Sequence, residues 1–344
     1  MDELKKEKLD ESNTERKSVY ELLEESITAS DISQDKKTAR LSRLIRMREK
    51  KANIMLVGAT GSGKSSTVNA LFNMEVAKVG AGVDPETDSM NCYVLDNLTI
   101  WDTPGLGDDV KRDEEYKKML IKKLNETDEN GDLLIDLVLV VLDASSKDLR
   151  TTYDLINNIL VPCLGEDNCN RILVGLNQAD MAMKGKHWDE EKNAPDDILL
   201  DYLKDKVISV EMRLIHSTHH VIKPIFYCAG YKDESGERKP YNLTKLLYYI
   251  LKSIPKDKRL ALVDNINPDD EMWLHNDKEE NYKEEVKRDF FETIGDCIDE
   301  SAELGMEMGE TLLGIPGVIV GAVVGATFGA AFGAVKGFFE GIFE

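Results

Sequence analysis

The stretch that decides the fold is Asn53–Thr67, which reads Asn-Ile-Met-Leu-Val-Gly-Ala-Thr-Gly-Ser-Gly-Lys-Ser-Ser-Thr. Its apolar part, Ile54–Val57, is typical of a buried parallel strand, and residues 65–72 have the spacing of a helix. The turn between them follows the pattern G-x-x-x-x-G-K-[ST], filled by Gly58, Gly63, Lys64 and Ser65.

A turn of this composition is suited to phosphate binding. Its glycines let successive backbone N–H groups point at one phosphate, and the helix that follows adds the positive end of its dipole. We expect Lys64 to bridge the β- and γ-phosphates and the Ser65 hydroxyl to bind Mg²⁺. The sequence therefore predicts a nucleoside triphosphate site. Its phosphate-contacting residues are Gly58, Thr60, Gly61, Ser62, Gly63, Lys64, Ser65 and Ser66.

Composition limits the range of partners. The chain has 344 residues and a formal net charge of −21, which argues against a protein that grips DNA or RNA over a broad surface, because such binding depends on clustered Lys and Arg. Five cysteines without metal-type pairing favour reduced thiols in the cytoplasm. The charged start, Met1–Asp10, lacks the apolar core of a signal peptide.

The order of elements predicts an α/β fold with a doubly wound, mostly parallel sheet and helical extensions at both ends. We expect a charged helical extension over 1–50, a nucleotide-binding domain over 51–256, an acidic helical segment over 257–310 and a glycine-repeat tail over 311–344. The extension has an amphipathic helix, Thr38–Met47. That helix either packs on the nucleotide domain, the favoured interpretation, or contacts acidic lipid or a partner. The expected strands after Asn53–Thr67 are Cys92–Leu95, Leu98–Trp101, Leu133–Leu142, Arg171–Leu176 and Val221–Tyr227, and the expected helices are Leu149–Leu164, Ile198–Leu214 and Leu243–Ile254.

Three further motifs follow expected strands. Asp102-Thr103-Pro104-Gly105 supplies a carboxylate for Mg²⁺ and, through Gly105, an N–H for the γ-phosphate. Asn177-Gln178-Ala179-Asp180 places a carboxylate where it can accept guanine N1–H and the exocyclic amine, which adenine does not offer. The Ala229 N–H comes after the next strand, where it can reach guanine O6.

In this order the motifs resemble those of the translation-factor-related GTPases, specifically the Era-like and septin-related branch. The residues after the loop lysine, Ser65–Leu71, are similar to those of the immunity-associated and chloroplast-import GTPases as well. The resemblance implies GTP or GDP and Mg²⁺ as ligands and a sheet of five or six strands with one antiparallel member. It also implies two nucleotide-sensitive loops, the first spanning Val79–Asn91 with Thr87 as a Mg²⁺ ligand.

Two positions depart from this family's pattern. Gln178 stands where a lysine usually lies along the base, so a lower GTP affinity is expected. Leu106 stands where many small GTPases keep a water-orienting glutamine, and an apolar side chain cannot polarise water. We therefore expect slow intrinsic hydrolysis, completed by a partner or a second subunit, with Lys64, Thr87 and Gly105 as the catalytic residues.

The tail resembles a glycine zipper, with glycines at 317, 321, 325, 329, 333, 337 and 341. Such spacing lets helix backbones approach closely, and the uncharged run has roughly the 20 residues that cross a bilayer. The tail is therefore either a membrane-inserting or self-assembling helix, which we favour, or a hairpin packed on this chain's own helices.

The sequence thus predicts a GTPase switch that controls membrane association or self-assembly through its tail. The predicted partners are a guanine nucleotide and a second copy of the chain, bound through the GTPase domain or the tail. A septin-like scaffold with incidental hydrolysis is the alternative. Ribosome association is disfavoured by the acidic charge and by the absence of an evident RNA-binding module.

Overall fold

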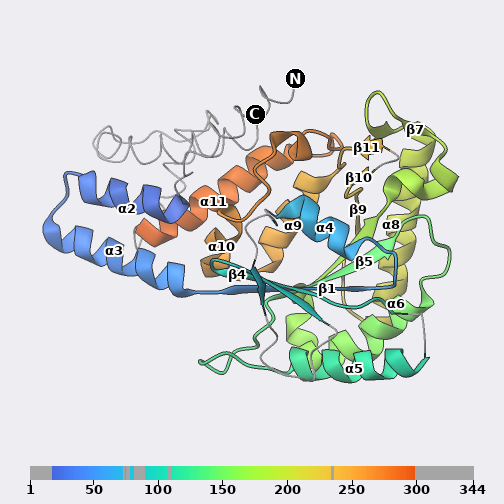
Figure 1. Cartoon of the computed structure of the whole chain (residues 1–344), viewed down its shortest axis with the longest axis horizontal. Coiled ribbons are helices and arrows are strands. Elements are labelled where there is room, and N and C mark those ends of the chain that lie inside the picture. Colours follow the sequence, from blue (N-terminus) through green and yellow to red (C-terminus); the bar gives the residue numbers. More distant parts are fainter. Residues whose placement is uncertain are drawn as a thin grey trace.

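The computed structural model describes residues 18–72, 74, 78–80, 90–106, 110–233 and 236–298. Its centre is a seven-stranded sheet in the order β2-β3-β4-β1-β5-β6-β9 (Figure 1). The strands are β1 (Ala52–Gly58), β2 (Lys78–Gly80), β3 (Asn91–Leu95), β4 (Leu98–Asp102), β5 (Leu137–Asp143), β6 (Ile172–Asn177) and β9 (Ile225–Phe226). In this sheet β3 runs antiparallel to β2 and β4, and the other pairs are parallel.

The prediction of a mostly parallel, doubly wound α/β fold is confirmed, with a sheet larger than the five or six strands implied by the resemblance. The extra strand is the three-residue edge strand β2, which is too short to leave a pattern in the sequence. The predicted strand Val221–Tyr227 is wrong in length, since only Ile225 and Phe226 pair with β6. Pro224 comes directly before them and has no N–H to donate to a ladder.

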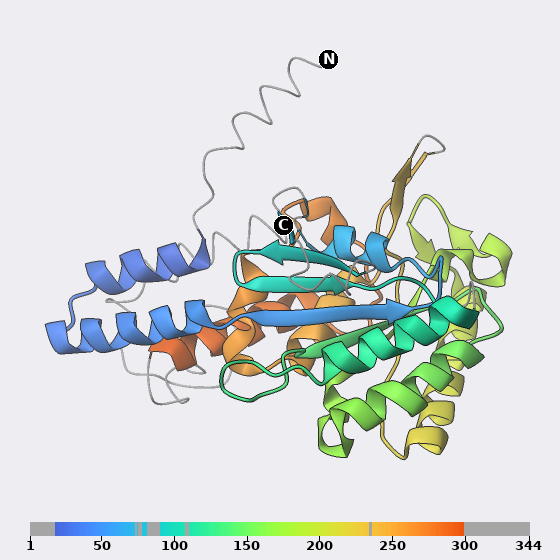
Figure 2. The ribbon, with the colours of Figure 1, turned by 60° about the horizontal axis from the view of Figure 1, so that its bottom comes forward.

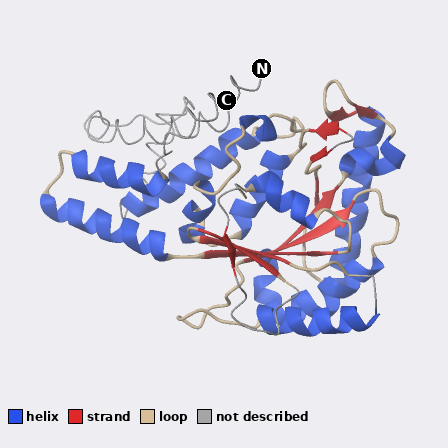
Figure 3. Ribbon diagram, viewed as in Figure 1, coloured by secondary structure: helices blue, strands red, loops and turns tan. Residues whose placement is uncertain are grey.

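Helices cover both faces of the sheet (Figure 3). They are α2 (Val19–Ala29), α3 (Gln34–Glu49), α4 (Lys64–Leu71), α5 (Val110–Leu124), α6 (Arg150–Leu155), α7 (Val161–Leu164), α8 (Asp197–Thr218), α9 (Leu243–Ser253), α10 (Leu260–Val263) and α11 (Tyr282–Ile298). A π-helical turn, Ile156–Leu160, joins α6 to α7, so the helix predicted over Leu149–Leu164 forms with one wider turn.

Each face of the sheet has its own apolar core. One core is formed by alternate residues of β1 such as Ile54 and Leu56 together with α4, α9, α10 and α11. The other takes the opposite β1 side chains, Met55 and Val57, together with α5 to α8. All four of these β1 side chains are at most 1% exposed. Burial of β1 on both faces explains its continuous apolar run.

The described part of the N-terminal extension, residues 18–50, contains a helical hairpin, α2 and α3, which lies beside α11 in two views (Figures 1 and 2). The side chains of Tyr20, Leu23 and Leu44 are buried in the same core as α9 and α11. The Tyr20 hydroxyl accepts a hydrogen bond from Asn97 Nδ2 at 2.9 Å. The described part of the extension therefore packs on the nucleotide domain, as the favoured interpretation of Thr38–Met47 predicted.

The segment after α9 is fixed to that helix by a buried ion pair. Lys245 Nζ lies 2.7 Å from Asp277 Oδ2, and both side chains are less than a tenth exposed. Trp273 is fully buried, and its Nε1 donates to Asn267 O at 2.9 Å. Leu274, the next residue, is instead 47% exposed.

The glycine-repeat tail, residues 311–344, lies outside the described residues, as do Thr87 and most of the first predicted switch loop. Among the helices that the structure describes, none combines the length and the apolar composition needed to cross a membrane.

Candidate functional site

The predicted phosphate loop joins the end of β1 to the start of α4. A Cβ atom at Gly58 would lie 2.2 Å from Val141 O, and one at Gly63 would lie 2.2 Å from Asn177 Nδ2. Gly63 has φ +87°, a left-handed conformation that favours glycine. The two motif glycines are therefore required by close packing as well as by the curl of the loop.

Lys64 lies inside this loop. Its Nζ donates to Gly58 O at 3.2 Å and to Ala59 O at 3.1 Å, and the residue is 8% exposed. These carbonyls hold the ammonium group against the loop, where the motif requires a cation for the β- and γ-phosphates. The role of Lys64 toward the phosphates stays a prediction.

The two described residues of the predicted metal site are in contact. Ser65 Oγ donates to Asp102 Oδ2 at 2.6 Å, and Asp102 Oδ1 is buried without a hydrogen-bond partner among the described residues. Burial raises the pKa of Asp102, while the Ser65 hydrogen bond and the Lys64 charge oppose that rise. A buried carboxylate oxygen with unused acceptor capacity beside a serine hydroxyl fits Mg²⁺, which prefers oxygen ligands and bound water.

The residues after Asp102 lie directly against the phosphate loop. The Leu106 N–H donates to Gly58 O and the Thr60 N–H donates to Leu106 O, both at 3.2 Å. A Cβ atom at Gly105 would lie 2.1 Å from Thr60 Oγ1. Leu106 is 3% exposed, so its side chain belongs to the core. No glutamine-like group is presented at this position.

The base-recognition loop supports the phosphate loop. Asn177 Nδ2 donates to Ser62 O at 3.0 Å, and Gln178 Nε2 donates to Gly61 O at 2.7 Å. The Gln178 backbone is in the left-handed region, with φ +60°. A lysine usually lies along the base at this position, whereas Gln178 donates a hydrogen bond to the phosphate loop.

Asp180, predicted to select guanine, is buried and already paired. Its Oδ2 lies 3.3 Å from Arg238 NH1, and its side chain is 4% exposed. The Ala229 N–H, predicted to reach guanine O6, donates to Asn177 Oδ1 at 3.0 Å. It would have to leave Asn177 to fulfil that role. The structure brings Asp180, Asn177 and Ala229 together at one end of the sheet.

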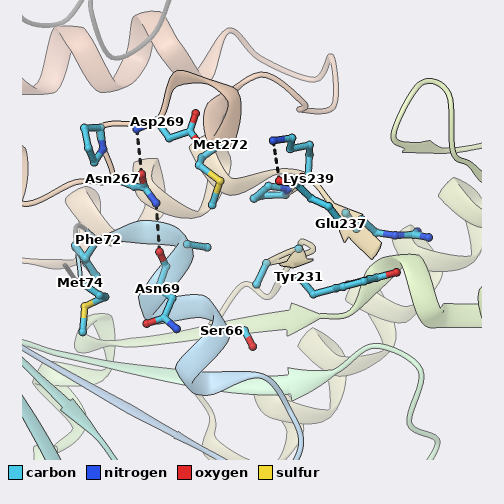
Figure 4. Close-up of a pocket in the computed structure, with 16 residues that line it drawn as sticks. Ser66, Asn69, Phe72, Met74, Tyr231, Glu237, Lys239, Asn267, Asp269 and Met272 are labelled. Carbon is cyan, nitrogen blue, oxygen red and sulfur yellow. Dashed lines mark hydrogen bonds and ion pairs between the residues drawn. The ribbon is translucent and has the colours of Figure 1, made fainter. Parts of the chain in front are cut away.

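A cavity of about 780 Å³ adjoins these residues, within the size range of small-molecule pockets. Figure 4 shows Ser66 and Asn69 on one side and Tyr231, Glu237 and Lys239 on the other. Ala229 and Arg238 also line it. Ser66 follows the Mg²⁺-site residue Ser65 directly, so the cavity begins where the phosphate loop ends.

Comparison with known families supports the interpretation of residues 58–65 as the phosphate loop of a GTPase. Residues 53–177 match the family described as 50S ribosome-binding GTPase. Those residues include the phosphate loop, the Ser65–Asp102 pair and Asn177. Residues 53–177 therefore carry the sequence signature of a P-loop GTPase family.

The GTPase domain also has relatives that match beyond it. The chain is 24% identical over 249 residues to an uncharacterized protein, YkfA, of Escherichia coli, covering 72% of this chain and 75% of that protein. It is 26% identical over 261 residues to immune-associated nucleotide-binding protein 8 of Arabidopsis thaliana, and the match covers 74% of this chain and 67% of that protein. A crystal structure of Toc33 from Arabidopsis thaliana matches with a TM-score of 0.40 and 16% identity, covering 70% of this chain and 98% of that one.

Arg238 is the site residue that sequence reasoning missed. It lies 58 positions after Asp180 in a charged stretch with no motif. The available signal was indirect: a buried carboxylate needs a partner, and the stretch after the last strand is rich in charge. The general prediction of a P-loop GTPase is confirmed, while the Era-like assignment stays a prediction.

Proposed function

We propose that this chain binds GTP and GDP with Mg²⁺ and hydrolyses GTP slowly, as a nucleotide switch. The observation that carries the proposal is the meeting of three motifs at the carboxyl end of one sheet. Lys64 lies against the carbonyls of the phosphate loop, Ser65 and Asp102 form an oxygen pair, and Asn177 donates to the same loop three residues before Asp180.

Each residue has a distinct task in this proposal. Lys64 would neutralise phosphate charge, and Ser65 with Asp102 would hold Mg²⁺, which would supply positive charge at the phosphates. Asp180 accepts the two donors on the guanine edge. Adenine presents a ring acceptor in place of N1–H, so it would leave the carboxylate incompletely paired.

Hydrolysis is expected to be slow without a partner. Leu106 is buried and apolar, so the nucleophilic water would lack the usual orienting amide at this position. The Gly58–Leu106 and Thr60–Leu106 hydrogen bonds also hold the Gly105 segment against Thr60. A γ-phosphate would have to share this space, which makes the segment a natural nucleotide sensor.

The output of the switch is proposed to involve the tail. Glycines every four residues over 317–341 suit close helix contacts in a membrane or an oligomer. Liposome flotation and light scattering of the full chain and of a chain ending at Glu310, each with GTP and GDP, test this output. If neither chain floats and both stay monomeric, the membrane and assembly roles are lost.

Nucleotide binding itself is tested by equilibrium titration with a fluorescent GDP analogue. Wild type should bind more tightly with Mg²⁺ than with EDTA, and Lys64→Ala should lose most of that affinity because the phosphates lose their cation. Arg150→Gln, an 87% exposed side chain, is the matched control for removal of a positive charge. Retention of wild-type affinity by Lys64→Ala would contradict the proposal.

A further inference from the structure

The carboxylate that should recognise guanine is covered by a side chain of the protein itself. Arg238 NH1 lies 3.3 Å from Asp180 Oδ2, with the two side chains 13% and 4% exposed. A carboxylate that recognises a ligand must be accessible to that ligand. In this arrangement Asp180 is nearly inaccessible and already paired with Arg238.

Arg238 and guanine offer Asp180 the same chemistry. A guanidinium group presents parallel N–H donors in a plane, and guanine N1–H with its exocyclic amine is an equivalent fork of donors. The Asp180 carboxylate has two oxygens to satisfy such a fork. Through NH1, Arg238 therefore occupies Oδ2, one of the two oxygens that guanine would need, while its NH2 pairs with Glu190.

Arg238 has other contacts that would remain if it left Asp180. Its NH2 lies 2.5 Å from Glu190 Oε1, and the Glu190 side chain is 71% exposed. The guanidinium also lies 5.6 Å from the centre of the Trp188 ring, a cation–π distance. The guanidinium can thus move outward toward Glu190 without becoming an unpaired buried charge.

The segment that carries Arg238 is a small hairpin, β10 (Tyr231–Asp233) and β11 (Gly236–Arg238). It projects from the edge of the domain in Figure 2. Its strands pair with each other, Tyr231 opposite Arg238, and not with the main sheet. Gly230 at its base has φ +72°, and a Cβ there would lie 2.4 Å from Arg238 O. The hairpin is therefore a two-stranded unit of its own that begins at a glycine.

We propose that Arg238 is a specificity-determining gate of the nucleotide site. It competes with guanine for Asp180, so that the β10–β11 hairpin closes the base site when it is empty and opens when guanine takes the carboxylate. This inference rests on the proposed guanine-nucleotide function. It adds that nucleotide binding changes the position of the hairpin, which lies next to Trp188 and the cavity of Figure 4.

The gate is tested by stopped-flow binding of fluorescent GDP to wild type and Arg238→Gln, with Arg150→Gln as the control. A site that must first open has its affinity reduced by the open fraction. Removal of the competing guanidinium should therefore raise the association rate and the affinity roughly tenfold. Hydrogen exchange of residues 231–238 gives a second reading: GDP should speed it in wild type and change it little in Arg238→Gln. Thermal unfolding of both variants verifies that they are folded.

A double-mutant cycle with Asp180→Asn identifies the contact. In the Asp180 background, Arg238→Gln should strengthen GDP binding. In the Asp180→Asn background, where fluorescent XDP is the ligand, Arg238→Gln should leave binding unchanged if Arg238 competes for the Asp180 carboxylate. Unchanged or weaker GDP binding by folded Arg238→Gln would overturn the gate. Weaker binding would show that Arg238 positions Asp180 instead. Failure of wild type and Arg238→Gln alike to bind GDP would refute the proposed function itself, which is a distinct outcome.

Discussion

Replacement of Asp264 by Asn should stabilise the protein at neutral pH. The Val19 N–H at the start of α2 donates to Asp264 Oδ1 at 2.6 Å, whereas Oδ2 is buried without a partner among the described residues. Burial raises the pKa of Asp264 from 3.8 to about 6, against the effect of the Val19 hydrogen bond. An Asn at this position keeps the acceptor for Val19 and removes the charge.

The sign follows from the direction of the shift. Because the folded-state pKa is above the unfolded value, the unfolded chain loses its proton first, and stability falls as pH rises from about 4 to about 6. A shift of about two units at 1.36 kcal/mol each makes the full penalty about 3 kcal/mol, reached above pH 6. Asp264→Asn should therefore gain about 2 to 3 kcal/mol at pH 8 and much less at pH 4.5.

Urea unfolding of wild type and Asp264→Asn at pH 4.5 and pH 8, at low protein concentration, measures this difference. The control is Asp257→Asn, which removes a half-exposed partner of Lys50 and should change stability by less than about 1 kcal/mol at either pH. A loss of stability in Asp264→Asn that is the same at both pH values would refute the reasoning, because it would show that the charge is needed rather than costly.

Three further substitutions test contacts of the site and its support. Gly63→Ala forces a side chain into a left-handed conformation and onto Asn177 Nδ2, so calorimetry should show a loss of roughly 1–3 kcal/mol together with weaker GDP binding. Ser65→Ala removes a metal-site hydroxyl, so titration should show that Mg²⁺ no longer strengthens GDP binding while affinity in EDTA is retained. Lys245→Met leaves Asp277 buried without its closest cation, and urea unfolding should show a loss of about 3–5 kcal/mol, part of which Asp277→Asn restores; a neutral effect would show that water reaches the pair.

Elements whose structure depends on neighbouring residues in the sequence could be predicted from local sequence patterns. The phosphate loop, β1 and the strand ends at Asp102 and Asn177 could be predicted because each is a short apolar run followed by residues with a fixed chemical task. The helix α9 likewise follows from its apolar spacing and the proline after it. These elements place the phosphate and metal parts of the site.

Long-range contacts could not be predicted in the same way. The Asp180–Arg238 pair joins residues 58 positions apart, and nothing in either local sequence indicates the other. Gln178 was recognised only as a departure from the family's lysine, and its hydrogen bond to Gly61 O had no signal in the sequence. The strand β9 (Ile225–Phe226) is shorter than the predicted strand Val221–Tyr227, because Pro224 has no N–H to donate to the ladder of hydrogen bonds.

The most direct test of the central claim is displacement of a fluorescent GDP analogue by GTP and by ATP in the presence of Mg²⁺. Asp180 can accept both donors of the guanine edge, so GTP should displace the analogue at a concentration at least about 100-fold lower than ATP. Asp180→Asn should move the preference toward xanthine nucleotides. Equal displacement by GTP and ATP would contradict the account.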